Sequence, residues 1–129
     1  MSASQRRKGM VAERELCHLL SDELGFVVKR NVDQARKGGA DCIEIPGYAI
    51  ECKRQEKLNR NAWWKQALEQ ADKCGMEPLV FFRQSRQPWR ALMVNGIHRE
   101  QWKEVSWEEA MYTVREKLAR LYAIHKKAA

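Results

Sequence analysis

The Pro46-Gly47 pair constrains the fold of this chain more than any other feature of its sequence. It separates residues 40–45 from residues 48–53, two runs with the apolar and β-branched content of strands. Proline followed by glycine is a turn signal, so the two runs are predicted to form a tight antiparallel hairpin. Residues paired across this turn have numbers that sum to about 93, which places Asp41 opposite a position near Cys52.

The other elements are predicted from periodicity, caps and turn residues on both sides of the hairpin. Helices are predicted at 8–24, 60–73 and 106–125, and further strands at 26–30, 79–83 and 89–94. A capping box of Ser106 and Glu109 opens the last helix, whose apolar stripe is interpreted as a packing face towards the core or a second subunit. The order αβββαββ plus a C-terminal helix predicts an α/β fold, in which helices flank a mixed β-sheet.

The length of 129 residues suits a single domain. We expect a basic arm at 1–7, a core at 8–94 and a helical extension at 95–129. The net charge of +7 favours an anionic partner, most commonly nucleic acid. The sequence shows no membrane span and no signal peptide, so we expect a cytoplasmic protein that does not bind membranes. Cysteines without CxxC spacing and three scattered histidines argue against a zinc site.

Glu51 and Lys53 are the first candidates for a functional site. Side chains alternate across a strand, so these two share one face at roughly 7 Å along the chain. A carboxylate and an ammonium group that follow an apolar run can also be a solvated ion pair at a half-exposed strand end. The pair alone therefore leaves both interpretations open.

Asp41 adds a second carboxylate, because the hairpin brings it next to Glu51 and Lys53. Two adjacent carboxylates repel each other unless a cation lies between them. Mg²⁺ prefers hard oxygen ligands, and Asp41, Glu51 and the backbone carbonyl of Cys52 would offer three. We therefore hypothesise a magnesium site at this edge of the sheet.

Glu13 is a third carboxylate, and it lies on the face of the first helix that carries Cys17, Leu20 and Leu24. A carboxylate in line with buried residues is costly unless it is paired or ligated. Alternatively, Glu13 is solvated near the start of the helix, where the helix dipole favours an anion. Three carboxylates and Lys53 would suffice for metal-dependent hydrolysis of a phosphodiester bond.

This constellation resembles a known nuclease signature. Asp41 followed by Glu51-Cys52-Lys53 resembles the PD-(D/E)xK motif, with Ala40 in place of its proline. Residues 7–16, and the run from Gly25 to Arg30, resemble the first helix and strand of archaeal-type Holliday junction resolvases and their phage relatives. The resemblance covers about residues 7–83, and the part from about residue 95 onwards is not covered by it.

The resemblance implies a restriction-endonuclease-like core and an endonuclease that uses Mg²⁺, with Mn²⁺ as a substitute. It implies a homodimer that cuts branched DNA, most specifically four-way junctions. Its implied metal ligands are Glu13, Asp41, Glu51 and the Cys52 carbonyl, with Lys53 as the catalytic lysine. It also implies that Gln66, otherwise a solvated helix residue, lies beside the active site.

Basic residues flank each candidate catalytic position and are predicted to bind DNA phosphates. Together with Gln66 they are Arg6, Arg7, Lys8, Arg30, Arg36, Lys37 and Arg54. Each cluster alone could equally be a solvated basic patch. Trp63 and Trp64 could stack on bases, but we favour the interpretation that at least one anchors the second helix to the sheet.

Two other functions remain open at this stage. One is a different nuclease with the same motif, such as a repair, restriction-like or general phage nuclease. The other is a basic DNA-binding module whose carboxylates are structural. Cleavage that requires Mg²⁺ and Lys53 would separate an enzyme from such a module.

Overall fold

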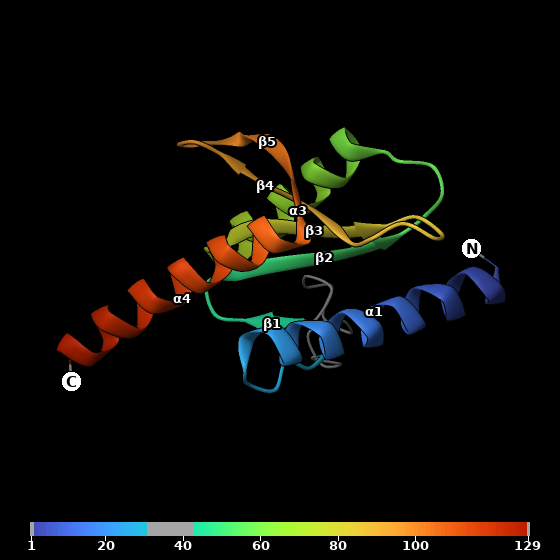
Figure 1. The fold of residues 1–129 in the computed structure, drawn as a ribbon. Helices are drawn as coiled ribbons and strands as arrows, with labels where there is room; N and C mark the ends of the chain where they lie inside the picture. The colour runs from blue at the N-terminus through green and yellow to red at the C-terminus, as the bar shows by residue number, and fades with distance from the viewer. Residues whose placement is uncertain (1, 31–42, 129) are drawn as a thin grey trace.

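The protein is an α/β structure with one five-stranded sheet, described here from a computed structural model for residues 2–30 and 43–128 (Figure 1). The elements in chain order are α1 (Ala3–Leu24), β1 (Glu44–Ile45), β2 (Tyr48–Arg54), α3 (Arg60–Cys74), β3 (Glu77–Arg83), β4 (Arg90–Asn95), β5 (His98–Ser106) and α4 (Trp107–Ala128). The predicted fold class is confirmed.

The strands lie in the order β1-β2-β3-β4-β5, and the sheet is mixed. β2 and β3 are parallel and are joined by α3, whereas the other neighbours are antiparallel. In the first hairpin Glu44 pairs with Ala49 and Ile45 with Tyr48, so paired numbers sum to 93. The register predicted from Pro46-Gly47 is therefore confirmed for the described part of the hairpin.

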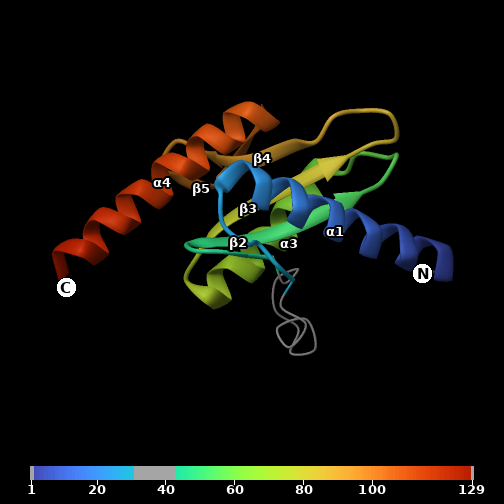
Figure 2. The ribbon, with the colours of Figure 1, turned by 60° about the horizontal axis from the view of Figure 1, so that its bottom comes forward.

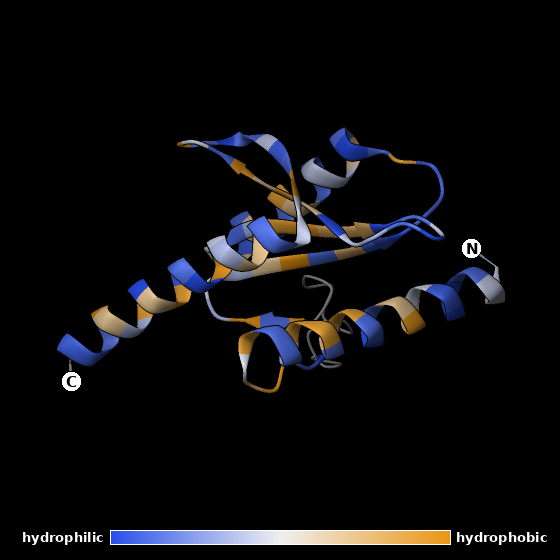
Figure 3. Cartoon of the chain, viewed as in Figure 1, coloured by the Kyte–Doolittle hydropathy of each residue, from blue (hydrophilic) through white to orange (hydrophobic). Residues whose placement is uncertain are grey.

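Helices cover both faces of the sheet (Figures 1 and 2). On one face, α1 and α4 pack on side chains of the central strands, including Ile50 and Phe81. On the other face, α3 packs on Val80 and Phe82. Apolar residues are concentrated in these central strands, whereas the ends of α1 and α4 that project from the body carry many polar residues (Figure 3). Residues that alternate along β2 consequently face two different helical layers.

The strand predicted at 26–30 is not formed. Helix α1 ends at Leu24, and its C-cap Gly25 has a φ of 80°. The segment reaches the sheet through the isolated bridge of Arg30 to Ile43 and through the Lys29 carbonyl, which accepts from Glu44 N at 3.2 Å. The Ser21 hydroxyl accepts a hydrogen bond from Val28 N at 2.8 Å and donates to Val28 O at 3.2 Å. The Ser21 side chain thus satisfies both backbone groups of Val28, so this residue needs no partner in a strand.

The basic arm predicted at 1–7 is wrong from residue 3 onwards, because helix α1 begins at Ala3 and not at residue 8. Ser2 caps the helix: its hydroxyl accepts from Gln5 N at 3.2 Å, and the Gln5 side chain accepts from Ser2 N at 3.0 Å. This Ser-x-x-Gln capping box compensates for the low apolar content of the first turns. The basic residues of this region are therefore carried on a helix.

The predicted helical extension at 95–129 begins instead with β5, which pairs antiparallel with β4. The two strands are joined at Gly96 and Ile97, and Gly96 has the positive φ of 72° that such a tight turn requires. Helix α4 follows directly, and the hydroxyl of Ser106 accepts from Glu109 N at 3.1 Å. The predicted N-cap is thus confirmed.

The first half of α4 packs on the core through Met111 and Val114, which confirms the packing face predicted for this helix. Farther along, Lys117 Nζ lies 4.4 Å from the centre of the Tyr48 ring and donates to the Gly47 carbonyl at 3.1 Å. Burial is the main cause that raises the pKa of the Tyr48 hydroxyl above its ordinary value. None of the described helices combines the length and apolar character needed to cross a membrane.

Candidate active site

The carboxyl-terminal half of β2 carries Glu51 and Lys53 on the face that α3 covers. Their partners in the parallel strand β3 are Val80 and Phe82, which belong to the apolar cluster under α3. Glu51 is only 3% exposed, and it is the one buried charged residue among those described. A carboxylate in such a place is costly unless it is ligated or hydrogen bonded. Strand alternation thus brings Glu51 and Lys53 to one face, as predicted.

Gln66 of α3 lies directly against the candidate lysine. Lys53 Nζ donates a hydrogen bond of 2.8 Å to Gln66 Oε1. Gln66 is therefore a hydrogen-bond partner of the Lys53 ammonium group, and not a helix residue that contacts solvent alone.

Glu13 of α1 forms an ion pair with Arg30. Arg30 Nε lies 2.7 Å from Glu13 Oε2, and the side chains are 37% and 16% exposed. Glu13 is more buried than Glu15, whose side chain is 38% exposed, which agrees with the helical face predicted for Glu13. Arg30 is thereby placed beside a candidate metal ligand, where it neutralises the carboxylate.

Three of the predicted site residues, Asp41, Arg36 and Lys37, lie outside the described residues, so their positions remain predictions. Among residues 2–30 and 43–128, no group of three or more acidic, histidine or cysteine side chains could hold a metal. The donors that the described part offers are carboxylate and carbonyl oxygens, which suit Mg²⁺ or Mn²⁺.

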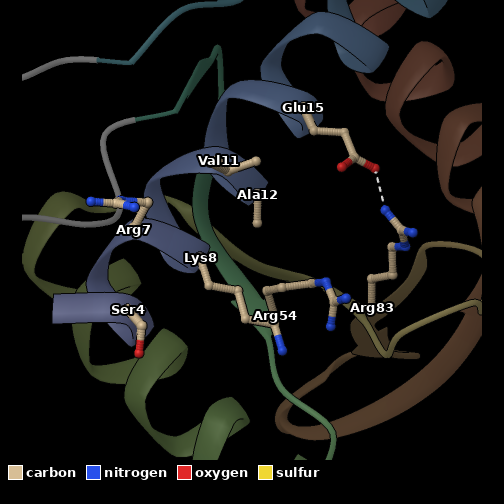
Figure 4. A pocket seen from close by; sticks show the side chains of 8 residues that line it. All are labelled: Ser4, Arg7, Lys8, Val11, Ala12, Glu15, Arg54 and Arg83. Carbon is tan, nitrogen blue, oxygen red and sulfur yellow. Dashed lines mark hydrogen bonds and ion pairs between the residues drawn. The ribbon is translucent and has the colours of Figure 1, made fainter. Parts of the chain in front are cut away.

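A basic cleft lies on the opposite face of β2, between that strand and the N-terminal half of α1 (Figure 4). Its volume is about 380 Å³. Its charged lining consists of Arg7, Lys8, Arg54, Arg83 and Glu15. Arg7, Lys8 and Arg54, three of the cations predicted to bind DNA, thus line one cleft. Arg6, which was also predicted to bind DNA, is exposed on α1 and is not part of the lining.

Arg83 and Glu15 were not predicted as site residues. Arg83 Nη1 donates to Glu15 Oε1 at 2.6 Å, and Trp89 Nε1 donates to the same oxygen at 2.8 Å. The sequence shows only that Arg83 stands at the end of an apolar strand. That this strand runs parallel to β2 and places Arg83 beside Arg54 is known from the structure.

A second polar cluster closes the same end of the sheet. Glu56 accepts hydrogen bonds from the backbone N–H and hydroxyl of Ser85 and from Arg54 Nη1. The Ser85 and Arg54 hydrogen bonds lower the pKa of Glu56 to about 2. Glu56 therefore ties the loop after β2 to the turn after β3 and orients Arg54.

Trp63 and Trp64 anchor α3 to the sheet. They are 4% and 2% exposed, so neither offers a ring face to a base, and the stacking interpretation is wrong for both. The Trp63 ring lies 5.5 Å from the Phe82 ring, and Trp64 Nε1 donates to the Arg99 carbonyl at 3.0 Å. The anchoring interpretation is confirmed.

A protein family and a solved structure are similar to this chain. The family of phage PDDEXK endonucleases matches residues 4–124. No curated protein matches the chain. Among solved structures, one match is the 1.6 Å structure of Hjc, a Holliday junction resolvase from the hyperthermophilic archaeon Archaeoglobus fulgidus. The two chains are 23% identical, the match covers 83% of this chain and 88% of that chain, and the TM-score is 0.48.

Proposed function

Because this chain belongs to the phage PDDEXK endonuclease family, we propose that it is a metal-dependent nuclease that hydrolyses phosphodiester bonds in DNA. The observation that carries this proposal is the buried carboxylate of Glu51, which shares the α3 face of β2 with Lys53. A buried carboxylate beside a lysine is poorly explained as a solvated ion pair, because almost none of Glu51 reaches water. It is well explained as a ligand of a cation.

We propose that Glu13, Asp41, Glu51 and the carbonyl of Cys52 hold Mg²⁺, for which Mn²⁺ can substitute. The residues fit such an ion because they offer hard oxygen atoms, one of them on a carboxylate that is nearly excluded from solvent. When bound, the ion would polarise the phosphate and lower the pKa of a water ligand. Arg30 would share Glu13 with the ion and limit the negative charge that gathers there.

Lys53 would act on the reacting phosphate. Its ammonium group can stabilise the negative charge that develops on the phosphate oxygens, or hold the attacking water. Gln66 would keep that group in place through the 2.8 Å hydrogen bond. A lysine side chain has a flexible stem, so a fixed acceptor reduces the number of positions that it samples.

For the substrate we propose branched DNA, with the four-way junction as the specific target. This step rests on the resemblance of residues 7–16 and of the run from Gly25 to Arg30 to archaeal-type junction resolvases. Cutting two strands of a junction symmetrically requires two active sites related by a twofold axis, so we propose a homodimer. Because the family is a phage family, we propose that the enzyme acts in the cytoplasm of a bacterial host cell.

The decisive experiment compares a four-way junction with nicked, single-stranded and linear duplex DNA, in Mg²⁺ and in EDTA. We expect cleavage only with Mg²⁺ or Mn²⁺, with the junction cut fastest and at symmetric positions. Lys53→Ala and Asp41→Ala should abolish cleavage and leave DNA binding largely intact. Lys103→Ala, which removes an exposed lysine from β5, is the control.

Each outcome of this panel separates one alternative. Equal cleavage of all substrates would leave a nuclease and remove the junction preference. Tight binding without cleavage would indicate a DNA-binding module. Cleavage by Asp41→Ala at the wild-type rate would refute the proposed metal site.

A further inference from the structure

Arg54 and Arg83 face each other at the carboxyl ends of two adjacent strands. They are register partners in the parallel pair of β2 and β3. Neighbouring strands lie about 4.8 Å apart, and like charges opposite each other in a sheet destabilise it. Two guanidinium groups at such a place therefore favour an anion between or above them.

Carboxylates at the edge of the cleft offset part of this charge. Arg54 Nη1 donates to Glu56 Oε1 at 3.0 Å, and Arg54 Nη2 donates to Ser85 Oγ at 2.9 Å. Arg83 Nη1 donates to Glu15, and Arg83 Nε donates to the Gln87 carbonyl at 3.1 Å. Because a guanidinium group has five N–H groups, these described bonds leave donors on both arginines for a further acceptor.

The cleft in front of the two arginines is open to a ligand and strongly basic. Its lining combines four cationic side chains with one carboxylate, Glu15. Figure 4 shows Arg54 reaching towards the side chain of Arg83, while Arg83 turns to Glu15 and Lys8 descends from α1. The four cations come from α1, β2 and β3, so the fold and not a single charged segment assembles them.

This cleft lies on the face of β2 opposite to the side chains of Glu51 and Lys53. Lys53 and Arg54 are consecutive residues of β2, so their side chains leave the strand on opposite sides. Lys53 contacts α3, whereas Arg54 lines the cleft under α1. A DNA strand that crosses the end of β2 would meet Lys53 on one side and the basic cleft on the other.

We propose that the cleft binds a backbone phosphate of the DNA that is not the phosphate being cut, with Arg83 and Arg54 as its principal ligands. This inference rests on the proposed nuclease function. Guanidinium groups bind phosphate oxygens through paired hydrogen bonds, which suits two arginines held side by side. Glu15 occupies Arg83 in the absence of DNA and competes with the phosphate for it.

Two substitutions that break the same ion pair test this subsite. Arg83→Gln removes the phosphate ligand, whereas Glu15→Gln removes its competitor and keeps the cation. The measurement is the equilibrium dissociation constant for a linear duplex in EDTA, at several salt concentrations. Arg83→Gln should weaken binding roughly tenfold at 0.1 M salt and reduce the slope of log K against log salt by about one. Glu15→Gln should tighten binding.

The opposite signs distinguish a phosphate subsite from a structural ion pair. A merely structural pair would make both variants lose thermal stability and bind DNA equally weakly, which would overturn the proposal. Arg7→Gln, on the exposed surface of α1, should also lower the salt slope and does not disturb the Glu15 pair. Lys103→Gln makes the same change in net charge on β5 and should leave the slope nearer to that of wild type.

The same binding measurements keep this inference distinct from the proposed function. If Lys53→Ala still cleaves DNA while Arg83→Gln and Glu15→Gln shift binding in opposite directions, the catalytic assignment fails and the subsite stands. If cleavage depends on Lys53 but the two variants bind DNA as wild type does, the subsite fails alone.

Discussion

Lys53 of β2 donates a 2.8 Å hydrogen bond to the side-chain oxygen of Gln66 in α3. The two residues are 13 positions apart, and the parallel crossover between β2 and β3 brings them together. Gln66 carries no charge, so this contact fixes the position of the ammonium group without neutralising it. We therefore propose that Gln66 positions Lys53, in addition to the DNA contact predicted for it.

Gln66→Ala should slow cleavage by about ten- to a hundredfold, because a small displacement of a catalytic group is costly. Binding of DNA in EDTA should change little. Single-turnover cleavage rates at saturating enzyme provide the measurement. Gln70→Ala is a matched control, since it removes the same side chain one helical turn along α3. Equal rates for the two variants would contradict the positioning role.

Gly47→Ala should destabilise the fold more than Gly96→Ala. Both glycines have positive φ, 84° and 72°, so alanine introduces backbone strain of about 1–2 kcal/mol at either site. Only at Gly47 does the added Cβ also meet α4, at 2.9 Å from Lys117 Cε and 3.1 Å from Leu121 Cδ1. Urea unfolding should show an additional loss of about 1 kcal/mol or more for Gly47→Ala.

Equal losses for the two glycine variants would show that the ends of the Lys117 and Leu121 side chains move away from residue 47 without cost. Such a result would contradict a rigid contact of these two side chains with the turn. Gly25→Ala adds a third reference, because Gly25 has a φ of 80° and an added Cβ there meets no atom within 4 Å.

Lys117→Met should lower the free energy of unfolding by about 1–3 kcal/mol, because two hydrogen bonds are lost. Lys117 Nζ donates to the Gly47 carbonyl and, at 3.2 Å, to Glu77 Oε1. Methionine retains most of the apolar stem but leaves the half-buried Glu77 without this partner. Lys127→Met, at the exposed end of the same helix, should have almost no effect on thermal or urea unfolding.

The candidate site was predictable from the sequence where local periodicity determines geometry. Alternation along β2 put Glu51 and Lys53 on one face, and Pro46-Gly47 determined the hairpin register. Both features depend on residues that are close in sequence, so the physical rules of strands and turns apply directly. The 3.6-residue period of a helix likewise predicted that Glu13 lies on the more buried side of α1.

The basic cleft was not predictable in full because it depends on pairing between distant segments. Arg83 becomes a partner of Arg54 only through the parallel register of β2 and β3. β5 was missed because its residues are mostly polar and one face is exposed, which leaves little hydrophobic alternation. The segment at 26–30 has the composition of a strand, but the hydroxyl of Ser21 satisfies both backbone groups of Val28 at its centre.

Glu56→Gln should destabilise the protein at neutral pH and lose this effect in acid. Hydrogen bonds from Ser85 and Arg54 lower the pKa of Glu56 from 4.5 to about 2. A carboxylate whose pKa is lowered by folding contributes stability above its unfolded pKa, and this contribution falls as the pH drops from about 4.5 towards 2. The difference in unfolding free energy between wild type and Glu56→Gln should therefore be largest at pH 7 and shrink steadily below pH 4.5.

Urea unfolding at pH 7, 4 and 2.5 provides the measurement. Glu69→Gln, which removes an exposed carboxylate from α3, should remain close to wild type at each pH. A constant difference for Glu56→Gln from pH 7 to pH 2.5 would show that the charge of Glu56 does not hold the two loops together.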